Sequence, residues 1–317
     1  MQERQSTGAE KEGALISRSA GLVVRVLLAL CVSALLYVIF HLLGNTVENA
    51  GGRSVFRWMV ARWNDPVSYG TDYSIGWIIP VVSAWVIWRR RSDLASAPRS
   101  VYWPALLLVL AALVLHWLGA RAQQTRVSLV SFVVLLWAIP LLIYGRKVAK
   151  ISIFPCAYLL FCIPYNFLDA ATFPLRLFAS KVAAGTLNGL GLPVERTGTI
   201  IRSLGEAGFD FNVADPCSGL HSLLAMGAIT AVFSFLTQPT LLRKWTLFIS
   251  ALPIAIASNV TRIVLVSLIA AALGADLAVK VYEQFSGYLV FIVGIALMLG
   301  LSHLMDRRWK GSVEHVA

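Results

Sequence analysis

Long apolar runs that end at clusters of Arg and Lys constrain this chain more than any other sequence feature. The runs lie near residues 20–43, 73–88, 104–120, 127–144, 151–164, 217–236, 245–273 and 280–305. Most of them approach the roughly 20 residues that a helix needs to cross about 30 Å of hydrocarbon. We therefore expect an all-α polytopic membrane protein with about eight transmembrane helices.

The composition agrees with this fold class. Hydrophobic residues make up 58% of the 317 residues and charged residues only 14%, whereas soluble chains are roughly 45–50% apolar and about 25% charged. The net charge of +11 could suggest a nucleic-acid partner. However, the basic residues gather at the ends of apolar runs, which is the pattern that orients a membrane protein. The expected partner is the lipid bilayer and not a nucleic acid, with both termini in the cytoplasm.

The sequence favours one integral-membrane domain, residues 20–310. Two cytoplasmic segments flank it, a flexible arm at 1–19 and a tail at 311–317. Residues 44–72 are expected to form a polar loop whose Trp58 and Trp63 lie at the outer membrane interface, where tryptophan is enriched.

Two segments between the fifth and sixth apolar runs differ from spans. Residues 173–190 mix polar with apolar residues, which indicates an amphipathic helix on the outer membrane surface. Residues 194–214 alternate around a turn near 203–208, which predicts a two-stranded β-hairpin. Open sheet edges cannot face lipid, so the hairpin is expected outside the hydrocarbon, in the periplasm.

Cys217 is the first candidate for chemistry. It follows Pro216 at the start of an apolar run, and a helix N-terminus or a nearby arginine lowers the pKa of a thiol. A thiolate there could attack a peptide carbonyl and form an acyl-thioester. The alternative is a structural thiol, as expected for the buried Cys31, Cys156 and Cys162. The four cysteines have no paired spacing, so neither a disulfide framework nor a metal site is expected, and no cofactor is implied.

Arg262 is the most informative charge, because it interrupts a run of Ala, Ile, Leu and Val. It shares a helix face with Asn259 by the i, i+3 rule. A charge inside a span costs at least about 2.5–3.5 kcal/mol, so it normally points into the helix bundle. The alternatives are a snorkelling arginine or a structural partner of a carboxylate. The expected topology brings Cys217, Arg262 and Glu283 to one membrane face.

Two further residues could assist Cys217. His221 lies four residues later and could orient or deprotonate the thiol, since histidine titrates near neutrality. It could equally be a helix-face histidine bonded to a neighbour. Glu283 could take part in catalysis or could be an interfacial carboxylate stabilised by the N-terminus of the last helix.

Together these motifs resemble the exosortase/archaeosortase family of membrane-embedded cysteine transpeptidases, from about residue 55 onward. The matching motifs are Asp72-Tyr73-Ser74-Ile75-Gly76-Trp77 with Pro80, Trp88-Arg89-Arg90-Arg91, Phe154-Pro155 through Ile163-Pro164, Leu187-Asn188-Gly189-Leu190-Gly191-Leu192-Pro193-Val194 with Gly198, Cys217-Ser218-Gly219-Leu220, Asn259-Val260-Thr261-Arg262 and Gly287 with Phe291.

The resemblance implies an enzyme of the bacterial inner membrane whose site faces the periplasm. Cys217 would attack a C-terminal sorting signal, made of a short motif, a transmembrane helix and a basic tail, on exported proteins. The acyl group would then pass to an acceptor nucleophile or to water, with Arg262 as proton donor or stabiliser of the tetrahedral intermediate. Bacterial members typically carry histidine where this chain has Glu283, and His221 stands where arginine is common. The chain is thus expected to be a divergent member.

Two other functions compete with this interpretation. One is a non-catalytic membrane component of a protein-export or exopolysaccharide system that keeps the scaffold without the activity. The other is a transporter, which would place polar groups along a path at mid-membrane, with broken helices there. The polar residues of this sequence gather toward one face instead.

Overall fold

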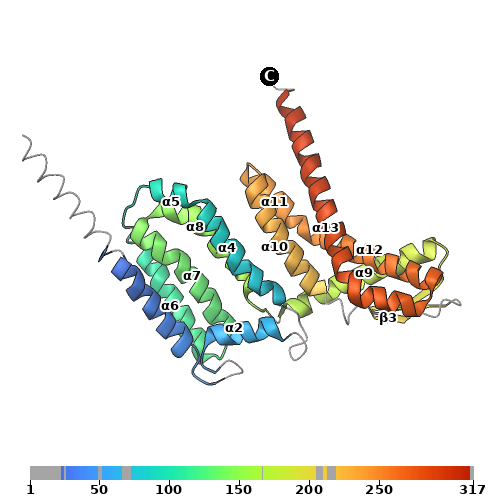
Figure 1. Ribbon diagram of the computed structural model, residues 1–317, viewed down its shortest axis with the longest axis horizontal. Coiled ribbons are helices and arrows are strands. Elements are labelled where there is room, and N and C mark those ends of the chain that lie inside the picture. Colours follow the sequence, from blue (N-terminus) through green and yellow to red (C-terminus); the bar gives the residue numbers. More distant parts are fainter. Residues whose placement is uncertain are drawn as a thin grey trace, which may run out of the picture. The chain divides into compact units, whose positions relative to one another are not determined.

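The computed structural model of the protein is mostly helical, with one small β-sheet (Figure 1). It describes residues 23–24, 26–48, 52–65, 73–165, 167–204, 210–212 and 219–314. For residues 167–171, 210–212, 219–222, 275–286 and 308–314 the description is limited to the backbone. The chain divides into two compact units, which we describe in turn. Unit 1 is Met1–Ala61 with Asp93–Ile153, and unit 2 is Arg62–Ser92 with Phe154–Ala317.

Unit 1 is built around an apolar helix pair. Its elements are the helix Val26–Leu42 with a π-helical last turn, α2 (Val55–Asn64), most of α5 (Arg91–Ser96), α6 (Ala105–Arg121), α7 (Thr125–Tyr144) and the first part of α8 (Arg146–Tyr158). Helices α6 and α7 pack side by side. Helix α7 ends because Gly145 takes a positive φ of 85° and its N–H bonds to the carbonyl of Leu141, a common glycine terminus of a helix.

Unit 2 holds the remaining elements. They are η2 (Ser74–Trp77), α4 (Ile78–Arg89), η3 (Leu159–Cys162), α9 (Phe167–Gly189), the strands, α10 (Gly219–Thr237), α11 (Leu241–Ile249), α12 (Ala251–Leu273) and α13 (Ala275–Glu314). Helix α13 packs along α12, and α9 and α10 also contact α12. Helix α12 is therefore the central helix of this unit.

The sheet contains three antiparallel strands in the order β1 (Val194–Thr197), β2 (Ile200–Ser203) and β3 (Asp210–Asn212). Strands β2 and β3 correspond to the predicted hairpin, with Ile201 opposite Phe211. The prediction of only two strands was wrong, because β1 adds a third. The alternation from residue 197 onward hid a tight turn at Gly198, whose φ of 65° suits glycine.

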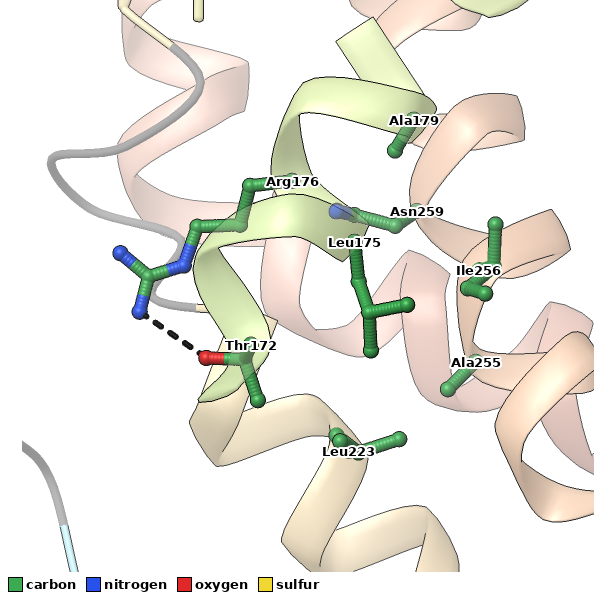
Figure 2. Close-up of a pocket in the computed structure, with 8 residues that line it drawn as sticks. All are labelled: Thr172, Leu175, Arg176, Ala179, Leu223, Ala255, Ile256 and Asn259. Carbon is green, nitrogen blue, oxygen red and sulfur yellow. Dashed lines mark hydrogen bonds between the residues drawn. The ribbon is translucent and has the colours of Figure 1, made fainter. Parts of the chain in front are cut away.

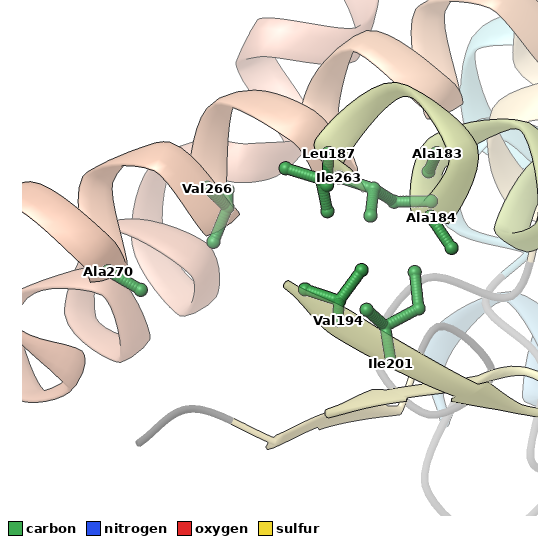
Figure 3. Close-up of a cluster of buried hydrophobic side chains, with 8 residues drawn as sticks. All are labelled: Ala183, Ala184, Leu187, Val194, Ile201, Ile263, Val266 and Ala270. Carbon is green, nitrogen blue, oxygen red and sulfur yellow. The ribbon is translucent and has the colours of Figure 1, made fainter. Parts of the chain in front are cut away.

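Helix α9 contacts both the sheet and α12, and side chains of all three meet in one buried cluster (Figure 3). The buried cluster that joins them contains Ala183, Ala184, Leu187, Val194, Ile201, Ile263, Val266 and Ala270. Two polar links reinforce it. Ser180 Oγ donates to the Gly198 carbonyl at 3.1 Å, and the Asn188 amide bonds both the N–H and the C=O of Val194, at 2.9 and 3.2 Å. The helix predicted at 173–190 is confirmed; its place on the membrane surface stays a prediction.

The membrane-spanning character of the chain is supported, although the number of spans stays a prediction. Among the described residues, three helical stretches are long and apolar enough to cross a membrane: Thr125–Tyr144, Leu241–Leu273 and Gly287–Arg307. Four shorter apolar helices are Val26–Leu42, Ser74–Arg89, Ala105–Arg121 and Leu223–Thr237. The expected fifth span differs most, because α8 begins at Arg146 and gives way to a 3-10 turn at Leu159.

The expected run 245–273 is also divided. Arg243 and Lys244 lie in the first turn of α11 and not in a connecting turn. The helix then breaks at Ser250, between α11 and α12. Pro253 explains the break, because a proline lacks an N–H and its ring clashes with the carbonyl four residues earlier.

Trp58 and Trp63 do not sit on an exposed interface as predicted. Only 8% of Trp58 and 5% of Trp63 is exposed, and both belong to α2, which replaces the expected loop. The indole Nε1 of Trp63 donates to the Cys162 carbonyl at 2.9 Å. Cys31 was also wrongly expected to be buried, since its side chain is exposed on an apolar helix.

Gly76 provides a test of this packing. A Cβ on Gly76 would overlap the indole of Trp63, so Gly76→Ala should destabilise the protein by about 1–3 kcal/mol, as overpacked cores do. Gly185 in α9 has open space around its Cβ position, and Gly185→Ala is the matched control with a neutral or slightly positive effect. Thermal unfolding in detergent measures both; equal stabilities for the two variants would contradict the packing.

Candidate functional site

The polar face of α12 is buried in unit 2. Arg262 is 4% exposed and Asn259 is 6% exposed. The Nη2 group of Arg262 donates to Oδ1 of Asn259 at 2.5 Å. The prediction that these residues share a helix face directed into the bundle is therefore confirmed. The burial of Arg262 excludes the snorkelling arrangement, because a snorkelling guanidinium lies in water.

A small cavity adjoins this face, between α9, α10 and α12 (Figure 2). Its lining consists of Thr172, Leu175, Arg176, Ala179, Leu223, Ala255, Ile256 and Asn259. Its volume of about 20 Å³ leaves room for about one water molecule. The cavity lets one small polar group approach Asn259, the hydrogen-bond partner of Arg262.

Arg176 is a second arginine at this place, and we did not single it out from the sequence. Its side chain is half-buried, and Nη2 donates to Thr172 Oγ1 at 3.3 Å across one turn of α9. In Figure 2 the guanidinium turns toward Thr172 and away from Leu175. The sequence signal for Arg176 was its i, i+4 spacing from Thr172 on an amphipathic helix. The sequence did not show that this face of the helix packs toward α10 and α12.

The other predicted site residues are placed only in part. Cys217 lies outside the described residues, and α10 begins two residues later at Gly219. His221 belongs to the first turn of α10 and Glu283 to α13, but only the backbone of each is described. The structure thus joins Arg262 to Asn259 and brings Leu223, in the second turn of α10, to the cavity. The roles of Cys217, His221 and Glu283 stay predictions.

The start of α13 changes the interpretation of Glu283. The last helix was expected to begin near Lys280, but α13 begins at Ala275, so Glu283 lies in its third turn. The field of a helix terminus falls off within the first turn. Stabilisation by the helix N-terminus therefore no longer explains a carboxylate at this position.

Helix α13 comes very close to the polar face of α12. A Cβ on Gly294 would lie 2.7 Å from the sulfur of Met226 in α10 and 3.2 Å from Ser258 Oγ in α12. Ser258 is fully buried beside Asn259. Glycine at position 294 thus allows three helices to meet next to the Arg262–Asn259 pair.

Comparison with known protein families identifies the family of this chain. The family described as transmembrane exosortase matches residues 63–300, more than half of the chain. The chain belongs to the transmembrane exosortase family. The matched span of this exosortase contains the positions of Cys217, His221, Arg262 and Glu283. No curated protein and no solved structure matches the chain.

The Arg262–Asn259 hydrogen bond predicts a stability effect. Asn259→Ala removes an acceptor from a buried cation, and hydrogen bonds to charged groups contribute about 1.5–3 kcal/mol. We expect a loss of that size in the free energy of unfolding, measured in detergent. Thr261→Ala is the control, because Thr261 is more exposed and its hydroxyl donates to the Ala257 carbonyl of its own helix, at 2.9 Å.

Replacing both partners completes this test. Arg262→Met with Asn259→Leu should recover most of the stability that Asn259→Ala loses, since buried polar pairs often exchange for apolar groups at little cost. If Asn259→Ala and Thr261→Ala had the same free energy of unfolding, the Arg262–Asn259 hydrogen bond would not contribute to stability.

Proposed function

We propose that this exosortase is a thiol-dependent transpeptidase that cleaves a C-terminal sorting signal through an acyl-thioester on Cys217. The observation that supports it most is the buried guanidinium of Arg262, hydrogen-bonded to a residue that lines a cavity. Leu223 of α10 lines the same cavity, and α10 is the helix that follows Cys217. A buried cation next to a cavity suits acyl transfer, in which negative charge develops on oxygen.

In the proposed reaction Cys217 is the nucleophile. His221 takes the thiol proton, and the sulfur attacks the carbonyl carbon of the scissile peptide bond. The C–N bond then breaks, and the leaving amine takes the proton from His221. An acceptor hydroxyl or amine, or water, next gives its proton to His221 and attacks the thioester. When the C–S bond breaks, the Cys217 thiolate recovers that proton.

Arg262 is proposed to stabilise the tetrahedral oxyanion. The guanidinium of arginine offers several N–H donors in a fixed planar geometry and is not known to be deprotonated in proteins, so stabilisation suits this residue better than proton donation. Because the group is buried, its interaction with an oxyanion is stronger than it would be in water. Asn259 fixes the guanidinium before the substrate arrives, which lowers the reorganisation needed in the transition state.

The sheet supports a location near the membrane surface. It packs on Ile263, Val266 and Ala270, the residues of α12 that follow Arg262. An open sheet cannot face lipid, so this part of α12 belongs outside the hydrocarbon. Arg262 then lies close to the boundary, and we propose that this side is the periplasmic face of a bacterial inner membrane.

Glu283 takes the third catalytic position in this proposal. A glutamate cannot stabilise an oxyanion while ionised, so its proposed role is to hold Arg262, while His221 serves as the base. The substrates are exported proteins with a motif, a transmembrane helix and a basic tail. The acceptor is a nucleophile supplied after the first cleavage, and no cofactor takes part.

A processing assay tests the chemistry. An exported reporter that carries such a tail should accumulate uncleaved with Cys217→Ala. Arg262→Lys should slow cleavage by about 10²–10³, the usual cost of losing an oxyanion donor. Cys31→Ser, on an exposed helix face, is the control and should process normally. Wild-type cleavage by a stably inserted Cys217→Ala protein would refute the proposal.

Thiol labelling tests the location separately. A membrane-impermeant maleimide added to cells from outside should label Cys217, whereas Cys156 and Cys162 are buried at 7% and 5% exposure. The experiment uses the Cys31→Ser background, and the same protein with Cys217→Ala gives the blank. Labelling only after the cytoplasmic side is opened would reverse the proposed topology.

A further inference from the structure

We propose that the protein binds the phosphate of an anionic phospholipid between Arg90 and Lys244, above the ring of Phe235. This lipid site is separate from the candidate catalytic site. Leu223, at the cavity, and Phe235 are twelve residues apart on α10, which corresponds to about 18 Å along a helix.

Two cations share one aromatic ring at this place. The Arg90 guanidinium lies 5.2 Å from the Phe235 ring centroid, and the Lys244 ammonium lies 4.6 Å from it. The two charges are therefore less than about one Debye length apart, which is roughly 10 Å. The ring attracts each cation, but the cations repel one another. A phosphate between them would turn this repulsion into two attractions.

The start of α11 adds to the positive field at Lys244, whereas Arg90 caps the C-terminus of α4, where the helix dipole is negative. Lys244 lies in the first turn of α11, whose N-cap is Thr240. Helix N-termini carry partial positive charge and favour anions, so a lysine there is unfavourable without one. Arg243 in the same turn lies 3.7 Å from Asp306, which shows that this part of the structure already holds one counter-charge.

The ring that the cations share is held in place. Phe235 stacks on Phe154, with the centroids 3.8 Å apart and the planes 2° apart. Both residues belong to unit 2, as do Arg90 and Lys244. The two cations therefore approach a fixed ring, and the helices that carry Phe235 and Lys244, α10 and α11, pack against each other.

The surroundings favour a lipid over a free phosphate. The site lies where helices α4 and α10 end and where the candidate span Leu241–Leu273 begins. Asp306, the partner of Arg243, lies near the end of a second candidate span, Gly287–Arg307. Span ends lie at the level of lipid headgroups. Exposed apolar side chains for acyl chains are nearby, namely Trp88 at 60%, Leu241 at 72% and Trp245 at 53%. Basic pockets between spans are known to take anionic headgroups.

Thermal unfolding of the purified protein in neutral detergent tests the site, with added phosphatidylglycerol, phosphatidylcholine or inorganic phosphate. Phosphatidylglycerol should stabilise the wild type most. The variant Arg90→Gln with Lys244→Gln should weaken phosphatidylglycerol binding about 25-fold, at about fivefold for each basic residue. Arg99→Gln is the control, because Arg99 lies 5.4 Å from the Tyr144 ring in unit 1 with the same kind of contact.

The possible results separate the alternatives. Equal stabilisation of the wild type and the double variant by phosphatidylglycerol would overturn the site. An equal effect of inorganic phosphate and phosphatidylglycerol would overturn the lipid as its ligand. If the double variant does not fold, the single variant Lys244→Gln replaces it. Native mass spectrometry then counts the lipids that the wild type and Lys244→Gln retain, and equal counts would overturn the site.

Discussion

The hydrogen bond between Arg262 and Asn259 is the interaction on which unit 2 depends. A guanidinium in the middle of an apolar helix has to be shielded from lipid and given a polar partner, or the span becomes too costly. Helices α9, α10 and α13 all contact α12, and Gly294 lets α13 come within reach of Ser258. The helices that shield this charge also leave a small cavity next to Asn259, its hydrogen-bond partner.

Much of the fold was accessible from the sequence, because apolar runs bounded by basic residues correspond closely to α4, α6, α7 and α10. The errors have local physical causes. Pro253 divides a run that hydropathy joins, and Gly198 allows a turn that the alternation hides. The burial of Trp63 depends on the Cys162 carbonyl, which lies far away in the sequence. Such tertiary partners leave no periodic signal in a single chain.

The candidate site was predictable to the extent that its residues share one element. Asn259 and Arg262 lie one turn apart, so their common face could be inferred from spacing alone. The importance of Arg176 depends on which face of α9 meets α12, and no spacing contains that information. The family was recognisable because several weak motifs occur in a fixed order, and the match over residues 63–300 confirms it.

The order of the helices along the chain has a consequence for biogenesis. A ribosome delivers α9 and α10 before α12, so two of the helices that cover Arg262 already exist when this charged segment reaches the insertion machinery. When α12 enters the membrane, the guanidinium of Arg262 can therefore pack against α9 and α10 and need not contact lipid tails. Helix α13 follows α12, and the described part of it contributes mainly apolar contacts such as Met298 and Phe291. Helices α9 and α10, which pack against α12, are thus made before the helix that carries Arg262.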